Sequence, residues 1–99
     1  ELLTRAQLRG GELELLEAQI TDDSPVLGRR PGDIPLPENC TLFVLLRGDA
    51  VLPIRGDTTF QSGDKVLAIA PTECELELRK QLIGDGDQPV GLASGIQTR

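Results

Sequence analysis

Alternating hydrophobic and polar positions divide this chain into short strands separated by turns. The clearest strand is TLFVLLR at residues 41–47, where nearly continuous hydrophobic residues indicate burial on both faces. Gly48-Asp49 and a second run, AVLPIR at 50–55, predict a hairpin with a tight turn. Pro53 has no amide hydrogen to donate, so we expect the second strand at a sheet edge or with a bulge. KVLAIA at 65–70 predicts a third strand.

The region before this hairpin is less regular. ELELLEAQI at 12–20 is favoured as a strand, and its phase changes between Leu15 and Leu16. That change indicates either a β-bulge or a strand covered on both faces. Four of the seven prolines lie in 21–40, which leaves room for a single helical turn near 30–34. Residues 1–11 show loosely helical spacing, which we interpret as the end of an upstream helix or linker.

A helix is predicted over 72–83. The motif TECE forms a capping box, in which the Thr72 hydroxyl and the Glu75 carboxylate bind the first free amides. Hydrophobic residues fall on two sides of this helix, which predicts that the sheet covers one side and a second copy of the chain covers the other. The residues expected at this dimer interface are Cys74, Leu76, Leu78, Leu82 and Ile83. Residues 85–99 are small and polar, and we expect a disordered tail or linker.

Composition narrows the class of protein. Ninety-nine residues with 38% hydrophobic content and two aromatics give a thin core, which favours a homodimer. The absence of Met indicates a segment of a longer chain. A net charge of −6 argues against nucleic-acid binding, and no hydrophobic run approaches membrane-spanning length, so no direct membrane insertion is expected. Cys40 and Cys74 are interpreted as free thiols rather than a disulfide.

Three Gly-Asp pairs raise the question of a cation site or an acid–base pair. Their aspartates, Asp49, Asp57 and Asp64, are eight and seven residues apart, and we favour turns over either kind of site. Without His or a nucleophile–base pair, the sequence predicts no catalytic residues, no metal ligands and no enzyme. Arg47 ends a buried strand, where it could grip an anion in a cleft or form an ion pair with a nearby aspartate.

The order of elements and several short motifs resemble one known family. DSPVLGRRPGDIPLPENC supplies a small residue, a Gly and a short helix, and LFVLLRGDAVLPIRGDTTFQSGDKVLAIAP supplies an Arg after the central strand, a Pro in the next and a Gly-Asp before the last. On these residues the chain, from Glu12 to about Gly84, resembles the TrkA-C domain. This domain, also called the C-terminal RCK domain, occurs in potassium-channel and cation-transporter regulatory subunits.

The resemblance implies a dimeric α+β fold, a small sheet built on the central hairpin with a C-terminal helix. It places the regulatory domain at 12–84, beside an upstream nucleotide-binding RCK domain or a transporter membrane domain in the cytoplasm. It also implies sensing of a ligand, cyclic di-AMP or a divalent cation in some members, although the residues themselves show no cofactor. By position, the ligand cleft would involve Leu46, Arg47, Pro53, Ile54 and Arg55. The alternative is a purely structural dimerisation domain of a membrane transporter, with no ligand.

Overall fold

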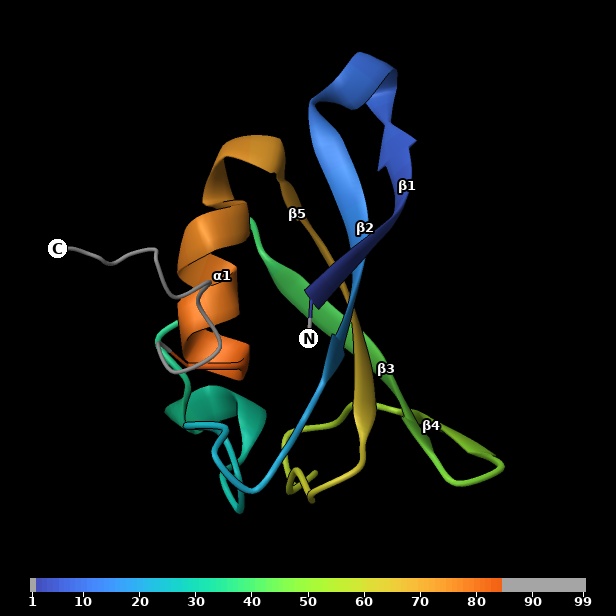
Figure 1. Ribbon diagram of the computed structural model, residues 1–99, viewed down its shortest axis with the longest axis vertical. Helices are drawn as coiled ribbons and strands as arrows, with labels where there is room; N and C mark the ends of the chain where they lie inside the picture. Colours follow the sequence, from blue (N-terminus) through green and yellow to red (C-terminus); the bar gives the residue numbers. More distant parts are fainter. Residues whose placement is uncertain (1, 85–99) are drawn as a thin grey trace, which may run out of the picture.

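The computed structural model describes residues 2–84 and shows a five-stranded antiparallel sheet with one helix against it (Figure 1). The order across the sheet is β1-β2-β5-β3-β4. The strands are β1 Leu2–Leu8, β2 Leu13–Gln19, β3 Thr41–Arg47, β4 Ala50–Pro53 and β5 Lys65–Pro71, followed by helix α1 Glu75–Leu82. Short 3-10 turns are η1 Arg9–Gly11, η2 Pro31–Asp33 and η3 Thr72–Cys74. The predicted α+β class, central hairpin and C-terminal helix are confirmed.

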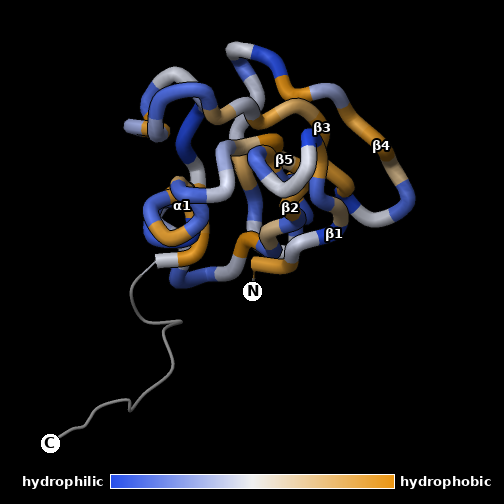
Figure 2. The backbone as a smooth tube through the Cα atoms, turned by 90° about the horizontal axis from the view of Figure 1, so that it is seen from above, coloured by the Kyte–Doolittle hydropathy of each residue, from blue (hydrophilic) through white to orange (hydrophobic). Residues whose placement is uncertain are grey.

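Two neighbours give β5 its central place in the sheet. It pairs with β2 in an unbroken register from Leu13–Pro71 to Gln19–Lys65, and with β3 on its other side. Figure 2 shows hydrophobic residues along β3, β4 and β5. β4 pairs only with β3, so Pro53 lies on an edge strand as predicted, where its missing amide hydrogen removes no bond from a central ladder.

One face of the sheet and α1 together enclose the core. Alternate residues of β2 and β5, such as Leu16, Ala18 and Val66, point to this face and are almost fully buried. They pack with Leu78 and Leu82 of α1 in one cluster. The remaining fully buried members include Ile20, Val26, Leu45, Phe60, Ala68 and Ala70. The loops 21–40 and 54–64 thus contribute to the core as well as connecting strands.

The predicted bulge in β2 is wrong, because β2 pairs with β5 without a register shift. The shifts occur instead in its neighbours, between Thr4 and Ala6 of β1 and between Leu42 and Val44 of β3. At the phase change, Leu16 is buried beneath α1, whereas Leu15 is half-buried on the opposite face of the sheet.

Residues 2–8 form strand β1. The helix that the spacing of residues 1–11 indicated is therefore wrong for this segment. η1 folds the chain back at Gly10 and Gly11, both with positive φ, and β1 then pairs along β2. Hydrogen bonding to β2, the next strand along the chain, overrides the local helical propensity of this segment. β1 therefore belongs to the same sheet as the segment 12–84.

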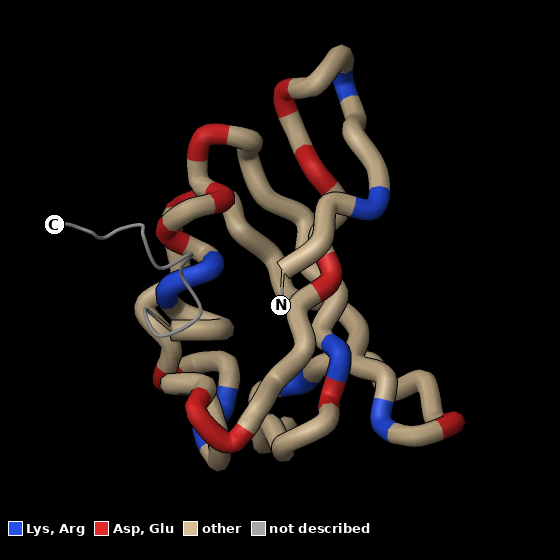
Figure 3. Tube along the Cα trace, in the orientation of Figure 1, with Lys and Arg blue, Asp and Glu red and all other residues tan. Residues whose placement is uncertain are grey.

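The start of the helix also differs from prediction, because no side chain caps it. The Thr72 hydroxyl donates a hydrogen bond to the Gly11 carbonyl oxygen, and the Thr72 amide donates to the Glu12 carbonyl oxygen at 3.0 Å. Thr72 therefore ties the start of η3 to η1, 61 residues earlier, instead of closing a capping box. Acidic residues in the first turn of α1 and basic residues in its last turn match the helix dipole (Figure 3).

Within the single chain, one side of the helix is buried. Leu78, Leu82 and Ile83 are all buried in the core of the same chain, whereas Leu76 is 59% exposed. Ile83 lies past the last residue of α1, where the helical wheel no longer fixes the direction of a side chain. No helix among residues 2–84 is long and hydrophobic enough to cross a membrane. The tail predicted for 85–99 lies outside the described residues.

Candidate functional site

A buried ion pair at one end of the sheet organises the candidate site. Asp64 lies just before β5 and is 1% exposed, while Arg47 is the last residue of β3. Arg47 Nε donates to Asp64 Oδ1 at 2.9 Å, and Arg47 Nη2 donates to Asp64 Oδ2 at 2.8 Å. This is the two-point contact for which a planar guanidinium is suited. Of the two roles predicted for Arg47, the ion pair is therefore formed within the chain.

Further hydrogen bonds fix both partners. The Gln61 amide donates to Asp64 Oδ2 at 2.9 Å, and Arg47 Nη2 also donates to the Thr59 carbonyl oxygen at 3.0 Å. Burial acts to raise the pKa of Asp64, but the bonds from Arg47 and Gln61 outweigh it and hold that pKa below its ordinary value of 3.8. The hydrogen bond from Arg47 to Asp64 is the main cause of a raised pKa of Arg47. Both groups are therefore charged at neutral pH.

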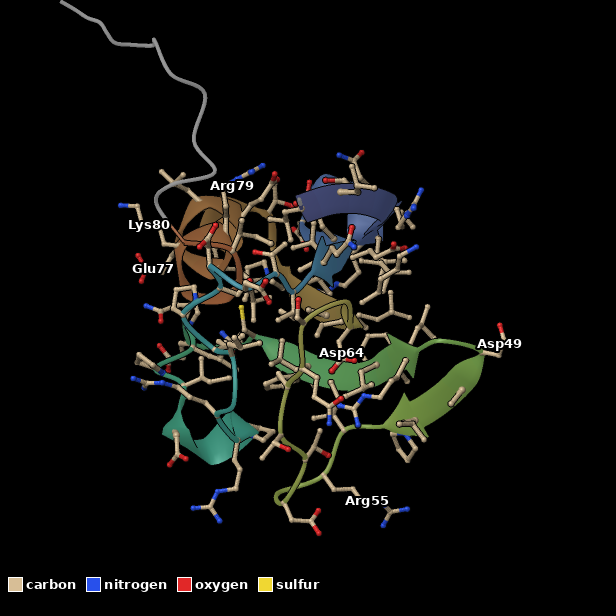
Figure 4. The ribbon with its side chains drawn as sticks, turned by 60° about the horizontal axis from the view of Figure 1, so that its bottom comes forward. Asp49, Arg55, Asp64, Glu77, Arg79 and Lys80 are labelled. Carbon is tan, nitrogen blue, oxygen red and sulfur yellow. The ribbon has the colours of Figure 1, made fainter. Side chains whose placement is uncertain are left out.

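The three Gly-Asp pairs play different parts. Gly48 and Gly63 adopt φ of +59° and +94°, the left-handed region that glycine favours in turns, while Gly56 does not. Asp49 lies at the tip of the β3–β4 hairpin, away from Asp64 (Figure 4). Asp57 is exposed. The three aspartates do not converge, and residues 2–84 hold no group of three or more acidic or cysteine residues able to bind a metal.

A pocket of about 420 Å³ opens beside the ion pair. It is lined by Leu45, Arg47, Leu52, Pro53, Arg55, Asp57, Thr58 and Thr59. Three of the five predicted ligand residues, Arg47, Pro53 and Arg55, are thus brought together. Leu46 and Ile54 do not line the pocket, because Ile54 packs against the core and Leu46 points to the opposite face of the sheet.

Two arginines lie at the edge of the pocket. Arg47 Nη1 has no hydrogen-bond partner among the described residues, although Nε and Nη2 are both engaged. Arg55 is exposed at the pocket wall, and its side chain points outward from the loop after β4 (Figure 4). Leu45 and Leu52 are hydrophobic residues of the pocket wall. Thr58 and Thr59, which the sequence reasoning did not single out, follow Arg55 closely in the chain.

The face of the sheet opposite α1 is the second feature of interest, and we call it the open face. Its hydrophobic side chains alternate with those of the core, and no helix of the described residues lies on it (Figure 1). They are Leu3, Ala6, Leu8, Leu13, Leu15, Val44, Leu46, Val51, Leu67 and Ile69. Val51 on the edge strand is the most exposed of them, at 69%. Glu17 on this face pairs with Arg5 at 3.0 Å.

Only part of the dimer surface predicted on the helix is accessible. Leu78, Leu82 and Ile83 are enclosed by their own sheet, which leaves Leu76 exposed and Cys74 half-buried. Cys40 and Cys74 are free thiols, in agreement with the sequence interpretation. Burial, and to a lesser degree the neighbouring Cys74, raises the pKa of Cys40 to about 11, so this thiol is a poor nucleophile at neutral pH.

Comparison with known proteins identifies the family. The profile of the TrkA-C domain matches residues 15–83, from β2 to the end of α1. This chain belongs to the TrkA-C domain family. The match covers the β3–β4 hairpin, the pocket beside it and the Arg47–Asp64 pair, so the candidate site lies entirely on the TrkA-C fold.

Three relatives of this TrkA-C chain are named for potassium uptake. The Trk system potassium uptake protein TrkA of Mycobacterium tuberculosis is 31% identical over 83 residues, which are 84% of this chain and 38% of that protein. The TrkA homolog of Archaeoglobus fulgidus is 32% identical over 75 residues, 76% of this chain and 17% of the relative. TrkA of Halomonas elongata is 41% identical over 63 residues, 61% of the chain and 14% of the relative. The chain thus spans well under half the length of these relatives.

Proposed function

We propose that this TrkA-C domain is a cytoplasmic regulatory unit of a potassium transport system. The family match and relatives named as potassium uptake proteins support this role. In it, the domain lies beside a nucleotide-binding RCK domain or a transporter and passes on the state of its own ligand site. The observation that carries the ligand-sensing part is the pocket at the β3–β4 hairpin, with one guanidinium edge unoccupied.

The ligand class follows from the pocket wall. Arg47 Nη1 and Arg55 offer positive charge, the threonines offer hydroxyl groups, and Leu52 and Pro53 offer hydrophobic surface. An organic anion with a flat or hydrophobic portion, such as a nucleotide, fits this combination better than a bare cation. Arg47 is fixed by Asp64 before any ligand arrives, which lowers the ordering cost of binding.

The test is a thermal-shift screen of the 99-residue chain with nucleotides, cyclic dinucleotides, inorganic phosphate and divalent cations. We expect an organic anion to raise the Tm, because a ligand that binds only the folded state stabilises it. With Arg55→Ala, the same Tm shift should require about ten times more ligand, since one charged contact is worth roughly 1–2 kcal/mol. Lys80→Ala removes the same charge from the exposed side of α1 and should leave the shift unchanged.

A homodimer through the open face completes the proposal. Hydrophobic residues from all five strands lie on this face, whereas α1 exposes only Leu76 as a large hydrophobic residue. Burying the open face against a second copy would supply the hydrophobic contact that a thin core lacks.

Two matched substitutions distinguish the open face from the helix as the dimer surface. Val51→Glu places a charge on the edge of the open face, and Leu76→Glu places one on the exposed side of α1. Both sites are exposed in the single chain, so neither change disturbs the core. We expect sedimentation to show that Val51→Glu shifts the chain toward monomer while Leu76→Glu remains dimeric. The opposite result would restore the helix as the interface, and a wild-type monomer at micromolar concentration would remove the dimer proposal.

A structural dimerisation domain without a ligand is the second candidate. The open face supports this function as well as it supports a ligand-sensing dimer, because two chains could associate through it without any ligand. A dimer that shows no Tm shift with any probe in the screen would select this function.

A further inference from the structure

A buried carboxyl group on the core face of the sheet has no obvious partner. Glu14 is 4% exposed, at a β2 position that alternates with Leu16 and Ala18 and therefore faces α1. Its Oε1 atom is buried without a hydrogen-bond partner in the described part of the chain. Glutamate is almost never fully buried unless it is paired, because ionised carboxylates lose most of their hydration there.

The fold brings a second carboxyl group to the same place. Glu14 lies opposite Ala70 of β5, and the chain then turns through η3 into α1, whose first residue is Glu75. The bonds of Thr72 to Gly11 and Glu12 hold this turn against the start of β2. Burial, and after it the neighbouring Glu75 carboxyl group, raises the pKa of Glu14 above its ordinary value of 4.5.

Two carboxyl groups can form a hydrogen bond only when one of them carries a proton. The buried group is the better place for that proton, because burial disfavours its charged form. Glu75 lies in the first turn of α1, where the helix dipole stabilises its negative charge. The arrangement therefore suits a neutral Glu14 that donates to Glu75, which would give the buried group the partner it otherwise lacks.

We propose that Glu14 and Glu75 hold one proton between β2 and α1, and that loss of this proton loosens the packing of α1 on the sheet. The inference is independent of the proposed ligand and of the dimer.

Few groups around Glu14 and Glu75 could compensate the negative charge once the proton is lost. β1 contributes the neutral amide of Gln7, which acts in the opposite direction on the pKa of Glu14, and β5 contributes Ala70. From η3 and α1 come the exposed Glu73 and, one turn beyond Glu75, Arg79, which has an interaction of its own. The nearby Arg9 already pairs with Glu12 at 3.6 Å.

The direction of the pH effect follows from the raised pKa. The folded state holds the proton more tightly than the unfolded chain, so the stabilising contribution of the pair is complete below about pH 4.5. It is lost as the pH rises through the folded pKa of Glu14. Above that value, two like charges face each other across the junction of β2 and α1.

The direct test is a carbon-detected NMR titration of the glutamate carboxyl groups in the 99-residue chain. We expect Glu14 to titrate clearly above the ordinary glutamate value, and amide protection in α1 to fall over the same pH range. In Glu75→Gln the neutral amide can donate to Glu14, so its pKa should return toward the ordinary value. A Glu14 that titrates normally in the wild-type chain would overturn the proposal, and this measurement needs no variant to fold.

Thermal unfolding at fixed protein concentration supplies a second measurement. Glu14→Gln keeps the shape of the side chain and can donate to Glu75 at every pH. It should raise the Tm at pH 8 by about 5 °C, a shift typical of a single improved interaction in a domain of this size, and leave it unchanged at pH 4. Glu73→Gln, two residues before Glu75 and exposed, is the matched control and should keep the wild-type pH dependence.

Two further results would contradict the shared proton. One is a Glu14→Gln variant with the same pH dependence as the wild type. The other is a rise in Tm at pH 8 on adding Mg²⁺ or Ca²⁺ that EDTA reverses and Glu14→Gln abolishes, because that would assign the two carboxylates to a cation instead.

Discussion

Asp64 joins two strand ends and a turn through a single carboxylate. It accepts hydrogen bonds from Arg47 of β3 and from the Gln61 amide, and it lies in the turn that leads into β5. Its partner is less enclosed, since the Arg47 side chain is 35% exposed while that of Asp64 is 1% exposed. The two halves of the ion pair should therefore respond differently to substitution.

Arg47→Met should destabilise the domain by about 3–5 kcal/mol at pH 7, because it leaves a buried carboxylate without its charged partner. Asp64→Asn should cost only about 1–3 kcal/mol, since the guanidinium left behind can reach water. Urea unfolding of the two variants measures both values. Equal losses would show that Asp64 is as well solvated as Arg47.

The pH dependence of this pair is opposite in sign to that of Glu14. Because the folded pKa of Asp64 lies below 3.8, its contribution to stability is present above pH 3.8 and is lost as the pH falls through the folded value. The free energy of unfolding of the wild type should therefore drop below pH 3.8, and Asp64→Asn should flatten that drop. If Asp64→Asn loses as much free energy of unfolding below pH 3.8 as the wild type, groups other than Asp64 cause the acid unfolding.

At the scale of elements, most of the sheet could be predicted from the sequence and its first strand could not. The hairpin, β2, β5 and the turn near 30–34 follow from local patterns of hydrophobic residues, Gly and Pro. Residues 2–8 have no such local signal, because β1 is defined by its pairing with β2. The capping box failed for a similar reason, since Thr72 binds Gly11, far away in the sequence.

The candidate site, too, could be predicted from the sequence only in part. Arg47, Pro53 and Arg55 could be found because they lie close together along the hairpin. The identity of the aspartate that binds Arg47 could not, since three Gly-Asp pairs look alike in sequence and only Asp64 is buried. The Glu14–Glu75 pair was equally hidden, because a polar residue within an alternating strand normally indicates the solvent side.

The bond from Thr72 to Gly11 gives a prediction for the element it anchors. Thr72→Val keeps the shape of the side chain and removes the hydroxyl, so we expect a loss of about 1 kcal/mol in the free energy of unfolding. Hydrogen exchange should speed up mainly at the start of α1 and in η1. Thr58→Val, whose hydroxyl accepts a bond from the Arg55 amide at 2.9 Å on the other side of the molecule, is the control and should leave α1 protection unchanged.

At the scale of the whole molecule, the pocket and the open face meet at β4. Leu52 and Pro53 line the pocket, while Val51 between Leu52 and the hairpin turn lies on the open face. A ligand that orders this four-residue edge strand should therefore favour the pairing of two chains, and pairing should favour the ligand by the same factor.

Sedimentation with and without the anion that gives the largest Tm shift measures this coupling. We expect the dimer Kd to fall about 5-fold or more when the pocket is saturated, within the range usual for coupled sites. Val51→Glu should weaken the ligand by a similar factor although it does not line the pocket, while Leu76→Glu, far from β4, should leave ligand affinity unchanged. Equal ligand affinities for monomer and dimer would mean that β4 does not connect the two sites, because a ligand can shift an equilibrium only by its difference in affinity for the two states.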